Sequence, residues 1–93
     1  GSFEYPEGDP IPLVSLFQRG AARHLQETPL SADQRIVDED DWRVRLSATV
    51  NDTALLRWWL LGFGAGVEVL EPVALRAEMA DTARRMAWRY RPV

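Results

Sequence analysis

The chain lacks cysteine and lysine altogether, and it contains a single histidine among its 93 residues. Without cysteine there can be no disulfide bond, no thiolate metal ligand and no cysteine nucleophile. Such a chain fits a reducing compartment, so we expect a cytoplasmic location. All eleven basic residues are arginine. A GC-rich coding sequence explains this bias more simply than selection for bidentate contacts does, so it carries little functional weight.

Long hydrophobic runs are also missing. No apolar run approaches the roughly 18 to 20 residues that a membrane span requires, and no signal-peptide pattern opens the chain. We therefore expect no contact with a membrane. Because 46% of the residues are hydrophobic, a chain of this length can build one domain around a single core. Gly1 and Ser2 resemble the remnant of a cleaved tag, which indicates a piece cut from a longer protein.

Acidic residues outnumber basic ones, and the formal net charge is −3. Residues 1–41 carry three Arg and nine acidic residues, whereas residues 42–93 carry eight Arg and five acidic residues. This polarity could orient association with a partner. It is not the strongly basic surface of a free-standing duplex binder, so we expect no specific binding of duplex DNA by this chain alone.

Hydrophobic periodicity and chain-breaking residues predict an alternation of strands and helices. The alternating pattern of residues 42–50 is the strongest strand signal, and the acidic run 38–41 marks the turn before it. Residues 51–53 offer a helix cap, and the glycines at 62, 64 and 66 end the helix that follows. The predicted order is strand 11–17, helix 19–27, strands 34–37 and 42–50, a helix ending near 62, strand 67–70 and helix 71–91.

This order is that of the ferredoxin-like βαββαβ fold with an added C-terminal helix. We predict an α+β domain at residues 11–91, preceded by a tag remnant and linker at 1–10 and followed by a tail at 92–93. Two helices would cover one face of the sheet, and the other face would be open. The open face would carry alternate residues of strand 42–50, which are Arg43, Arg45, Ser47 and Thr49.

Residues that could carry catalysis or hold a metal ion are sparse. His24 has no second histidine and no cysteine to complete a zinc site. Ser31 and Ser47 have no second histidine to serve either of them as a base, so a serine triad is not supported. The acidic run 38–41 lacks the ligand spacing and the glycine of a calcium loop. The glycines at 62–66 follow a helix rather than a strand, so they form no phosphate loop. We predict no catalytic residue, no metal site and no cofactor.

Two groups of arginines are candidates for binding an effector or a partner. Arg43 and Arg45 stand two residues apart on one strand, so both project to the same side, about 6 to 7 Å apart. This spacing suits successive phosphates or a pair of carboxylates; local pairing with Glu68 is the alternative. The second group lies near the end of the last helix, where the helix dipole favours cations in any case. Its members are Arg84, Arg85 and Arg89.

The two long helices carry more apolar surface than one small fold needs to cover. Apolar residues recur at helical spacing at Leu55, Leu56, Trp59, Leu60 and Phe63. Trp58 and Leu61 lie outside the stripe formed by the last four of these. Either the added C-terminal helix or the linker, or else another subunit or domain, could cover them, and we expect a homodimer. The last helix carries a stripe of Leu75, Met79, Ala83, Met86 and Tyr90. The predicted interface residues are Trp58, Leu61, Met79, Met86 and Tyr90.

Two stretches of the sequence are similar to a known family. They are residues 27–34 (ETPLSADQ) and residues 52–64 (DTALLRWWLLGFG), the second continuing into 67–72 (VEVLEP). Together they resemble the C-terminal extension, called WCX, of bacterial WYL-domain transcriptional regulators, over about residues 11–90. In that family a winged helix-turn-helix domain and a central WYL domain precede the extension. Ser15 and Trp58 depart from the family, which tends to have a larger aliphatic residue and a polar residue there.

The resemblance implies a non-catalytic domain with a ferredoxin-like fold that dimerises and couples an effector to the attached DNA-binding domain. Its partners would be the WYL and winged-helix domains, and DNA would be contacted only through the full-length regulator. The resemblance also implies that, in some relatives, this domain takes part in sensing a nucleic-acid or nucleotide effector.

The alternative is a module that binds single-stranded nucleic acid or a nucleotide directly on its open sheet face. RNA-recognition domains use such a face, but they place stacking aromatic residues on the central strands.

Overall fold

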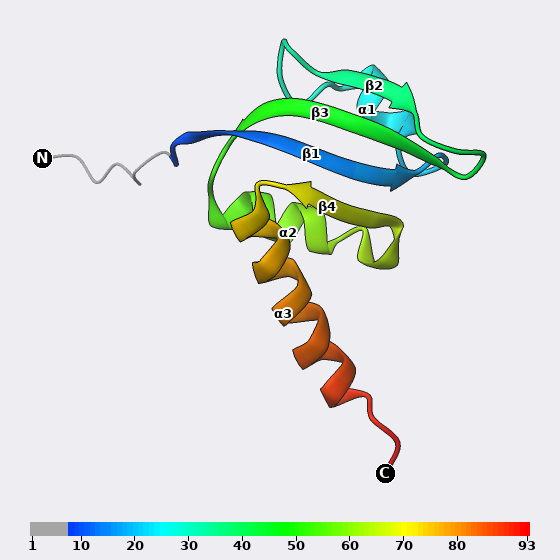
Figure 1. Cartoon of the computed structure of the whole chain (residues 1–93), viewed down its shortest axis with the longest axis vertical. Helices are drawn as coiled ribbons and strands as arrows, with labels where there is room; N and C mark the ends of the chain where they lie inside the picture. Colours follow the sequence, from blue (N-terminus) through cyan, green and yellow to red (C-terminus); the bar gives the residue numbers. More distant parts are fainter. Residues whose placement is uncertain (1–7) are drawn as a thin grey trace, which may run out of the picture.

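The computed structural model describes residues 8–93. The predicted tag remnant and most of the predicted linker lie outside the described residues. Every predicted strand and helix is present, with shifted ends. The elements are β1 (Pro10–Gln18), α1 (Arg23–Glu27), β2 (Arg35–Asp38), β3 (Arg43–Asn51), α2 (Ala54–Leu61), the short 3-10 helix η1 (Gly64–Gly66), β4 (Val67–Glu71) and α3 (Val73–Arg89), as labelled in Figure 1.

The four strands form one antiparallel sheet in the order β2-β3-β1-β4. The central strand β1 pairs with β3 along its whole length, from Pro10 opposite Asn51 to Gln18 opposite Arg43. On its other side β1 pairs with β4, with a register shift between Val14 and Ser15. The predicted α+β class is confirmed.

Strand alternation divides the sheet into a packed face and an open face. Phe17 of β1, Leu46 of β3 and Val69 of β4 are buried on the packed face. The helices add side chains to the same hydrophobic cluster, so all of them lie against this one face. The helical members of the cluster are Leu25 of α1, Leu56 and Leu60 of α2, and Leu75 of α3.

The start of α2 follows the predicted capping pattern. Thr53 is the N-cap, and its hydroxyl accepts a hydrogen bond from the backbone N–H of Leu56 at 3.1 Å, which satisfies one of the free amides of the first turn. The prediction for Leu55 is wrong, because this side chain is 71% exposed. At 100° per residue its position is about 90° away from the centre of the buried stripe.

The glycine-rich segment ends α2, as predicted, but the left-handed residue comes later than a simple C-cap would place it. Gly62 caps the helix with a right-handed φ of −62°. Gly64 has a φ of +56°, which is the conformation that favours glycine. The chain then turns through η1 into β4.

α3 leaves the body of the domain and extends away from the sheet (Figure 1). Leu75 in its first turn is buried, Met79 is half-buried, and residues 83–93 are all exposed. Arg57 of α2 holds the base of this helix, since its guanidinium donates hydrogen bonds to both carboxylate oxygens of Glu78, at 2.6 and 3.1 Å. The first half of α3 is therefore fixed to the domain, while the second half has no cover from residues 8–93.

Candidate functional site

The open face of the sheet carries the arginines of β3 that the sequence singled out. Arg43 and Arg45 point to this face, as the alternation predicted, and Leu16 of β1 lies opposite Arg45 in register. Glu68 of β4 lies opposite Leu16 on the other side. Leu16 is only 6% exposed, so the long side chains flanking it cover the apolar centre of the face.

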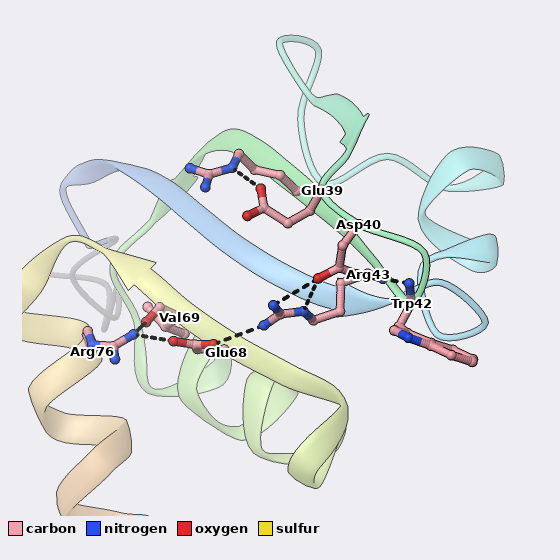
Figure 2. Close-up of polar contacts among 8 residues, drawn as sticks. Glu39, Asp40, Trp42, Arg43, Glu68, Val69 and Arg76 are labelled. Carbon is pink, nitrogen blue, oxygen red and sulfur yellow. Dashed lines mark hydrogen bonds and ion pairs between the residues drawn. The ribbon is translucent and has the colours of Figure 1, made fainter.

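Arg43 is held by two carboxylates (Figure 2). Its Nε and Nη2 atoms donate hydrogen bonds to Oδ2 of Asp40 at 3.0 and 2.9 Å. Its Nη1 atom donates a longer bond to Oε1 of Glu68 at 3.5 Å. The local pairing with Glu68 that was the alternative for this arginine is therefore present, but the shorter contacts are to Asp40.

Asp40 organises the turn between β2 and β3. Its Oδ1 atom accepts hydrogen bonds from the backbone N–H groups of Trp42 and Arg43, at 2.9 and 2.7 Å. The N–H of Trp42, together with the bonds from Arg43, lowers the pKa of the Asp40 carboxyl. The acidic run thus forms a hydrogen-bonded turn between two strands, as predicted, except that Asp38 is the last residue of β2 and pairs with Val44.

Arg45 has a separate partner. Its Nε atom donates a hydrogen bond to Oε1 of Glu39 at 3.0 Å, and this bond raises the pKa of Arg45. The side chains of Arg43 and Arg45 are 41% and 40% exposed. Exposed ion pairs of this kind stabilise by only about 0 to 1 kcal/mol each. A multiply charged anion could therefore compete with the carboxylates for both guanidinium groups.

Glu68 connects the open face to α3. Its Oε2 atom accepts a hydrogen bond from Nη1 of Arg76 at 2.8 Å, and the same nitrogen donates to the carbonyl oxygen of Val69 at 2.9 Å. Figure 2 shows the resulting line of contacts from Asp40 through Arg43 and Glu68 to Arg76. Sequence reasoning missed Arg76 in this role, and the acidic run beside the two arginines was the only signal for the rest.

A pocket of about 650 Å³ lies beside this ion-pair network. Its walls come from the end of β1, the turn before β3, and the start of β4, and they include Gln18, Trp42, Arg43 and Glu68. Trp42 is 79% exposed, and its indole ring points away from the network in Figure 2. The site thus combines an aromatic surface with paired charges of both signs.

The second arginine group lies elsewhere. Arg84 and Arg85 contact Asp81 at 3.7 and 3.2 Å, and Trp88 and Arg89 join these two arginines around a shallow pocket of about 360 Å³. All four side chains belong to the half of α3 that extends from the domain (Figure 1). The structure therefore does not bring the two predicted arginine groups together.

The predicted interface residues fall into two places. Leu61, Met79 and Met86 line an apolar groove of about 370 Å³ between α3 and the segment from α2 to β4. Tyr90 is exposed at the end of α3 beyond this groove, and Trp58 is exposed on α2 outside it. The added helix thus borders Leu61 but leaves Trp58 uncovered by any described residue.

Residues 8–93 contain no group of three or more His, Cys, Asp or Glu side chains that could hold a metal ion. Within this described part of the chain, no helix combines the length and the hydropathy that a membrane crossing requires.

Comparison with known proteins identifies the family. The family model of the WCX domain matches residues 9–87, which span the whole sheet, α1, α2 and α3 up to its last two residues. A comparison with curated protein sequences found no significant match. The family match confirms the resemblance found in the sequence: the chain belongs to the WCX domain family, whose members are regulatory domains associated with the WYL domain.

Proposed function

We propose that this WCX domain is the dimerisation and effector-coupling domain of a WYL-family transcriptional regulator, with no catalytic activity of its own. The second half of α3 is the observation that carries the proposal. Residues 83–93 are exposed although they include Met86 and Trp88, and most helices in proteins owe their stability to packing of an apolar face. A partner that covers this half would supply the missing packing.

The fold supports the same assignment. The strand order β2-β3-β1-β4, with antiparallel neighbours throughout, makes β1 and β2 parallel with β3 between them. This split βαβ arrangement is a feature of the ferredoxin-like fold, so we infer that fold here, with α1 reduced to a short helix. In this proposal α3 is the addition that faces the partner.

The ion pairs of the open face support a route for effector coupling. An anionic effector at Arg43 would compete with Glu68, and Glu68 also holds Arg76 at the base of α3. Binding at the sheet would then change the contacts of the helix that faces the partner. Because each exposed pair is worth up to about 1 kcal/mol, one such exchange corresponds to a coupling of at most about fivefold.

The partners follow from this role. The WYL and winged-helix domains of the full-length regulator would be the neighbours in the same chain, DNA would be contacted only through the winged-helix domain, and the absence of cysteine supports a cytoplasmic location. For the 93-residue chain alone we expect no specific duplex binding, because its net charge is −3. Submicromolar, sequence-dependent binding at physiological salt would contradict this.

Light scattering after size-exclusion chromatography tests the dimerisation. We expect a dimer at high micromolar concentration, and we expect Met86→Glu to shift it to monomer because a charge would replace an apolar side chain. The control is Val37→Glu, which places the same charge at an exposed apolar position of β2. A wild-type chain that stays monomeric at this concentration would reject the dimerisation part of the proposal.

The alternative function, direct binding of single-stranded nucleic acid or a nucleotide on the open face, has one observation in its favour, the exposed Trp42 beside Arg43. Against it, no position of this face on β3 carries an aromatic residue: after Arg43 they are Arg45, Ser47 and Thr49. Titration of a labelled oligonucleotide distinguishes the two functions. Binding that is lost in Arg43→Gln and persists in Ser47→Ala would favour the alternative.

A further inference from the structure

An apolar pocket of about 360 Å³ lies beside the start of α2. Its walls come from the loop after α1, the end of β3 and the first turns of α2, and none of the lining residues is charged. We call it the entry pocket, and it is lined by Leu30, Val50, Thr53, Leu55, Leu56 and Trp59. No residue of α3 contributes to its walls, and Leu55 is 71% exposed. The pocket therefore leaves a large aliphatic side chain in contact with water.

The chain enters the domain next to this pocket. Pro10, the first residue of β1, lies opposite Asn51 at the end of β3, and Ile11 lies opposite Val50. Ile11 and Val50 both pack against the hydrophobic core, so they lie on the packed face of the sheet, where the helices are. The wall formed by Val50 therefore adjoins the first residues of β1, at the end of the sheet where β3 leads into α2 (Figure 1).

Gly8 and Asp9 extend this contact to the start of α2. The carbonyl oxygen of Asp9 accepts a hydrogen bond from the N–H of Asp52 at 2.9 Å. Gly8 lies so close to Asp52 that a Cβ atom at this position would overlap the carbonyl oxygen of Asp52. Asp52 directly precedes Thr53 of the entry pocket. The described chain therefore begins in contact with the residue next to the pocket wall.

The segment that precedes Gly8 is long enough to reach the pocket. Residues 3–7 (FEYPE) contain two aromatic residues, Phe3 and Tyr5. An extended chain spans at most about 3.5 Å per residue, so Tyr5 lies within about 10 Å of Gly8 and Phe3 within about 17 Å. Both aromatic rings are therefore within range of the entry pocket.

The sequence pattern favours the side of the sheet on which the pocket lies. Alternate residues of an extended chain project to the same side. Phe3 and Tyr5 are in phase with Ile11 and Leu13, which pack on the face of the sheet that carries the helices. Pro6 disfavours a helical backbone at Tyr5 and favours an extended one. An extended segment 3–7 would therefore direct the two rings towards α2 rather than towards the open face.

We propose that residues 3–7 bind in the entry pocket of the same molecule, with the rings of Phe3 and Tyr5 against Leu55 and Trp59. Aromatic side chains bury a large apolar area, and the pocket offers them uncharged walls. Because the segment is joined to the domain at Gly8, docking needs no second molecule, and its cost is the ordering of a few residues. This contact is separate from the dimerisation proposed above and does not depend on it.

Docking of this segment would couple the chain before the domain to α3. Asp52, whose N–H bonds the carbonyl oxygen of Asp9, also accepts a hydrogen bond from Arg57 through its carboxylate. Arg57 in turn bonds Glu78 of α3. The entry of the chain and the base of α3 therefore share Asp52 and Arg57, and a change in how the segment docks would act on the residues that hold α3.

Nuclear Overhauser effects in the isotope-labelled 93-residue chain test the docking directly. We expect cross-peaks between the ring protons of Phe3 or Tyr5 and the methyl groups of Leu55. Gly8→Ala should weaken these cross-peaks severalfold, because the added Cβ atom must move the segment away from Asp52. A wild-type chain without such cross-peaks would overturn the proposal. Cross-peaks between labelled and unlabelled molecules in a mixture would assign the pocket to the segment of a second copy, which would also overturn it.

Thermal melting gives an independent measure of the same contact. Replacing Phe3 and Tyr5 together by Ser should lower the melting temperature by about 4 to 8 °C, the shift expected when a domain of this size loses a modest apolar contact. Glu4→Ser, between the two aromatic residues, is the control and should leave the melting temperature unchanged.

A double-mutant comparison shows whether the segment acts through the pocket. Leu55→Ala should lower the melting temperature of the wild-type chain, and it should have little further effect when Phe3 and Tyr5 are already Ser. Trp58→Ala is the matched control, because Trp58 lies on the same helix and is 71% exposed, as Leu55 is, but does not line the pocket. Its effect should be the same in both backgrounds. If Leu55→Ala also has equal effects in both, the segment does not contact Leu55 and the proposal is wrong.

Discussion

Glu68 divides its two carboxylate oxygens between two arginines from different elements. Oε1 accepts a hydrogen bond from Arg43 of β3 at 3.5 Å, and Oε2 accepts one from Arg76 of α3 at 2.8 Å. The difference in length means that Glu68 is held mainly by Arg76. Arg43 therefore loses little when its contact with Glu68 is broken, and its shorter bonds to Asp40 remain.

Replacing Arg43 and Arg45 by Gln together tests whether this face binds an effector. In the 93-residue chain we expect the free energy of unfolding to change by less than about 1 kcal/mol, because both ion pairs are exposed. In the full-length regulator we expect the response to effector to be lost. Unfolding in urea measures the first effect, and a reporter assay of the regulator with and without effector measures the second.

Arg35→Gln is the control for the double variant, since Arg35 lies opposite Ser47 on the same face of the sheet and should leave the response unchanged. A normal response of the double variant, together with unchanged stability, would mean that Arg43 and Arg45 form only a solvated strand surface.

Arg57→Gln is expected to destabilise the domain by about 1 to 2 kcal/mol at pH 7, because the guanidinium bonds both Glu78 and Asp52 and charge-assisted bonds are stronger than neutral ones. The hydrogen bond from Arg57 lowers the pKa of Glu78. This contribution is complete above the ordinary pKa of a glutamate and is lost as the pH falls through the lowered value.

The difference between wild type and Arg57→Gln should therefore shrink between pH 7 and pH 3, as measured by urea unfolding. Arg84→Gln, whose nearest partner Asp81 is 3.7 Å away on the exposed half of the same helix, is the control and should change little. A difference that stays constant with pH would assign the effect of Arg57 to packing of its side chain.

The sequence predicted the parts of this fold that depend on local pattern. The alternation of β3 and the Thr53 cap of α2 were both foreseen, since each needs only neighbouring residues. The start of α1 was placed too early because tertiary contacts decide it. The N–H of Arg19 bonds the carbonyl oxygen of Trp42 at 2.9 Å, which extends the pairing of β1 with β3 past the predicted helix start.

In the candidate site, too, contacts between neighbouring residues could be predicted from the sequence, and contacts set by the tertiary fold could not. The pairing of Arg43 with Asp40 spans three residues and was within reach of the sequence, whereas the contact of Glu68 with Arg76 depends on the direction in which α3 leaves β4. The apolar stripe of α3 could be seen in the sequence. Such a stripe has the same spacing whether it packs on its own domain or extends beyond it. Only the structure shows that the stripe is buried at Leu75 and exposed from Ala83 onward.

Asp33 is expected to set part of the acid sensitivity of the domain. The hydroxyl of Ser31 and then the hydroxyl and N–H of Thr49 donate hydrogen bonds to its carboxylate, and they lower its pKa to about 2. The contribution of these bonds to stability is present above the ordinary value of 3.8 and is lost as the pH falls towards about 2. Asp33→Asn should therefore lower the melting temperature at pH 7 and flatten its pH dependence below pH 4.

Asp41→Asn, on the exposed turn before β3, is the control for this titration and should keep the wild-type pH profile. If Asp33→Asn melts at the wild-type temperature at pH 7, the bonds to Thr49 contribute nothing to the attachment of the 28–34 loop to β3.

Ser15 is expected to be a weak point of the core. It is fully buried, it lies between Leu46 and Val69 in the sheet, and its Oγ atom has no hydrogen-bond partner among residues 8–93. A buried hydroxyl without a partner costs about 1 to 3 kcal/mol. Ser15→Ala removes the hydroxyl and leaves only a small space, so we expect it to raise the free energy of unfolding by about 1 kcal/mol.

Urea unfolding of Ser15→Ala beside Ser47→Ala tests this, because Ser47 stands on the open face of the same sheet and should change the free energy of unfolding by no more than about 0.5 kcal/mol. Ser15→Val adds a larger aliphatic side chain, and it should stabilise further only if the neighbouring side chains can move apart. A loss of stability in Ser15→Ala would mean that the hydroxyl has a partner in solution, such as a buried water, because an apolar methyl group at this position could not replace that bond.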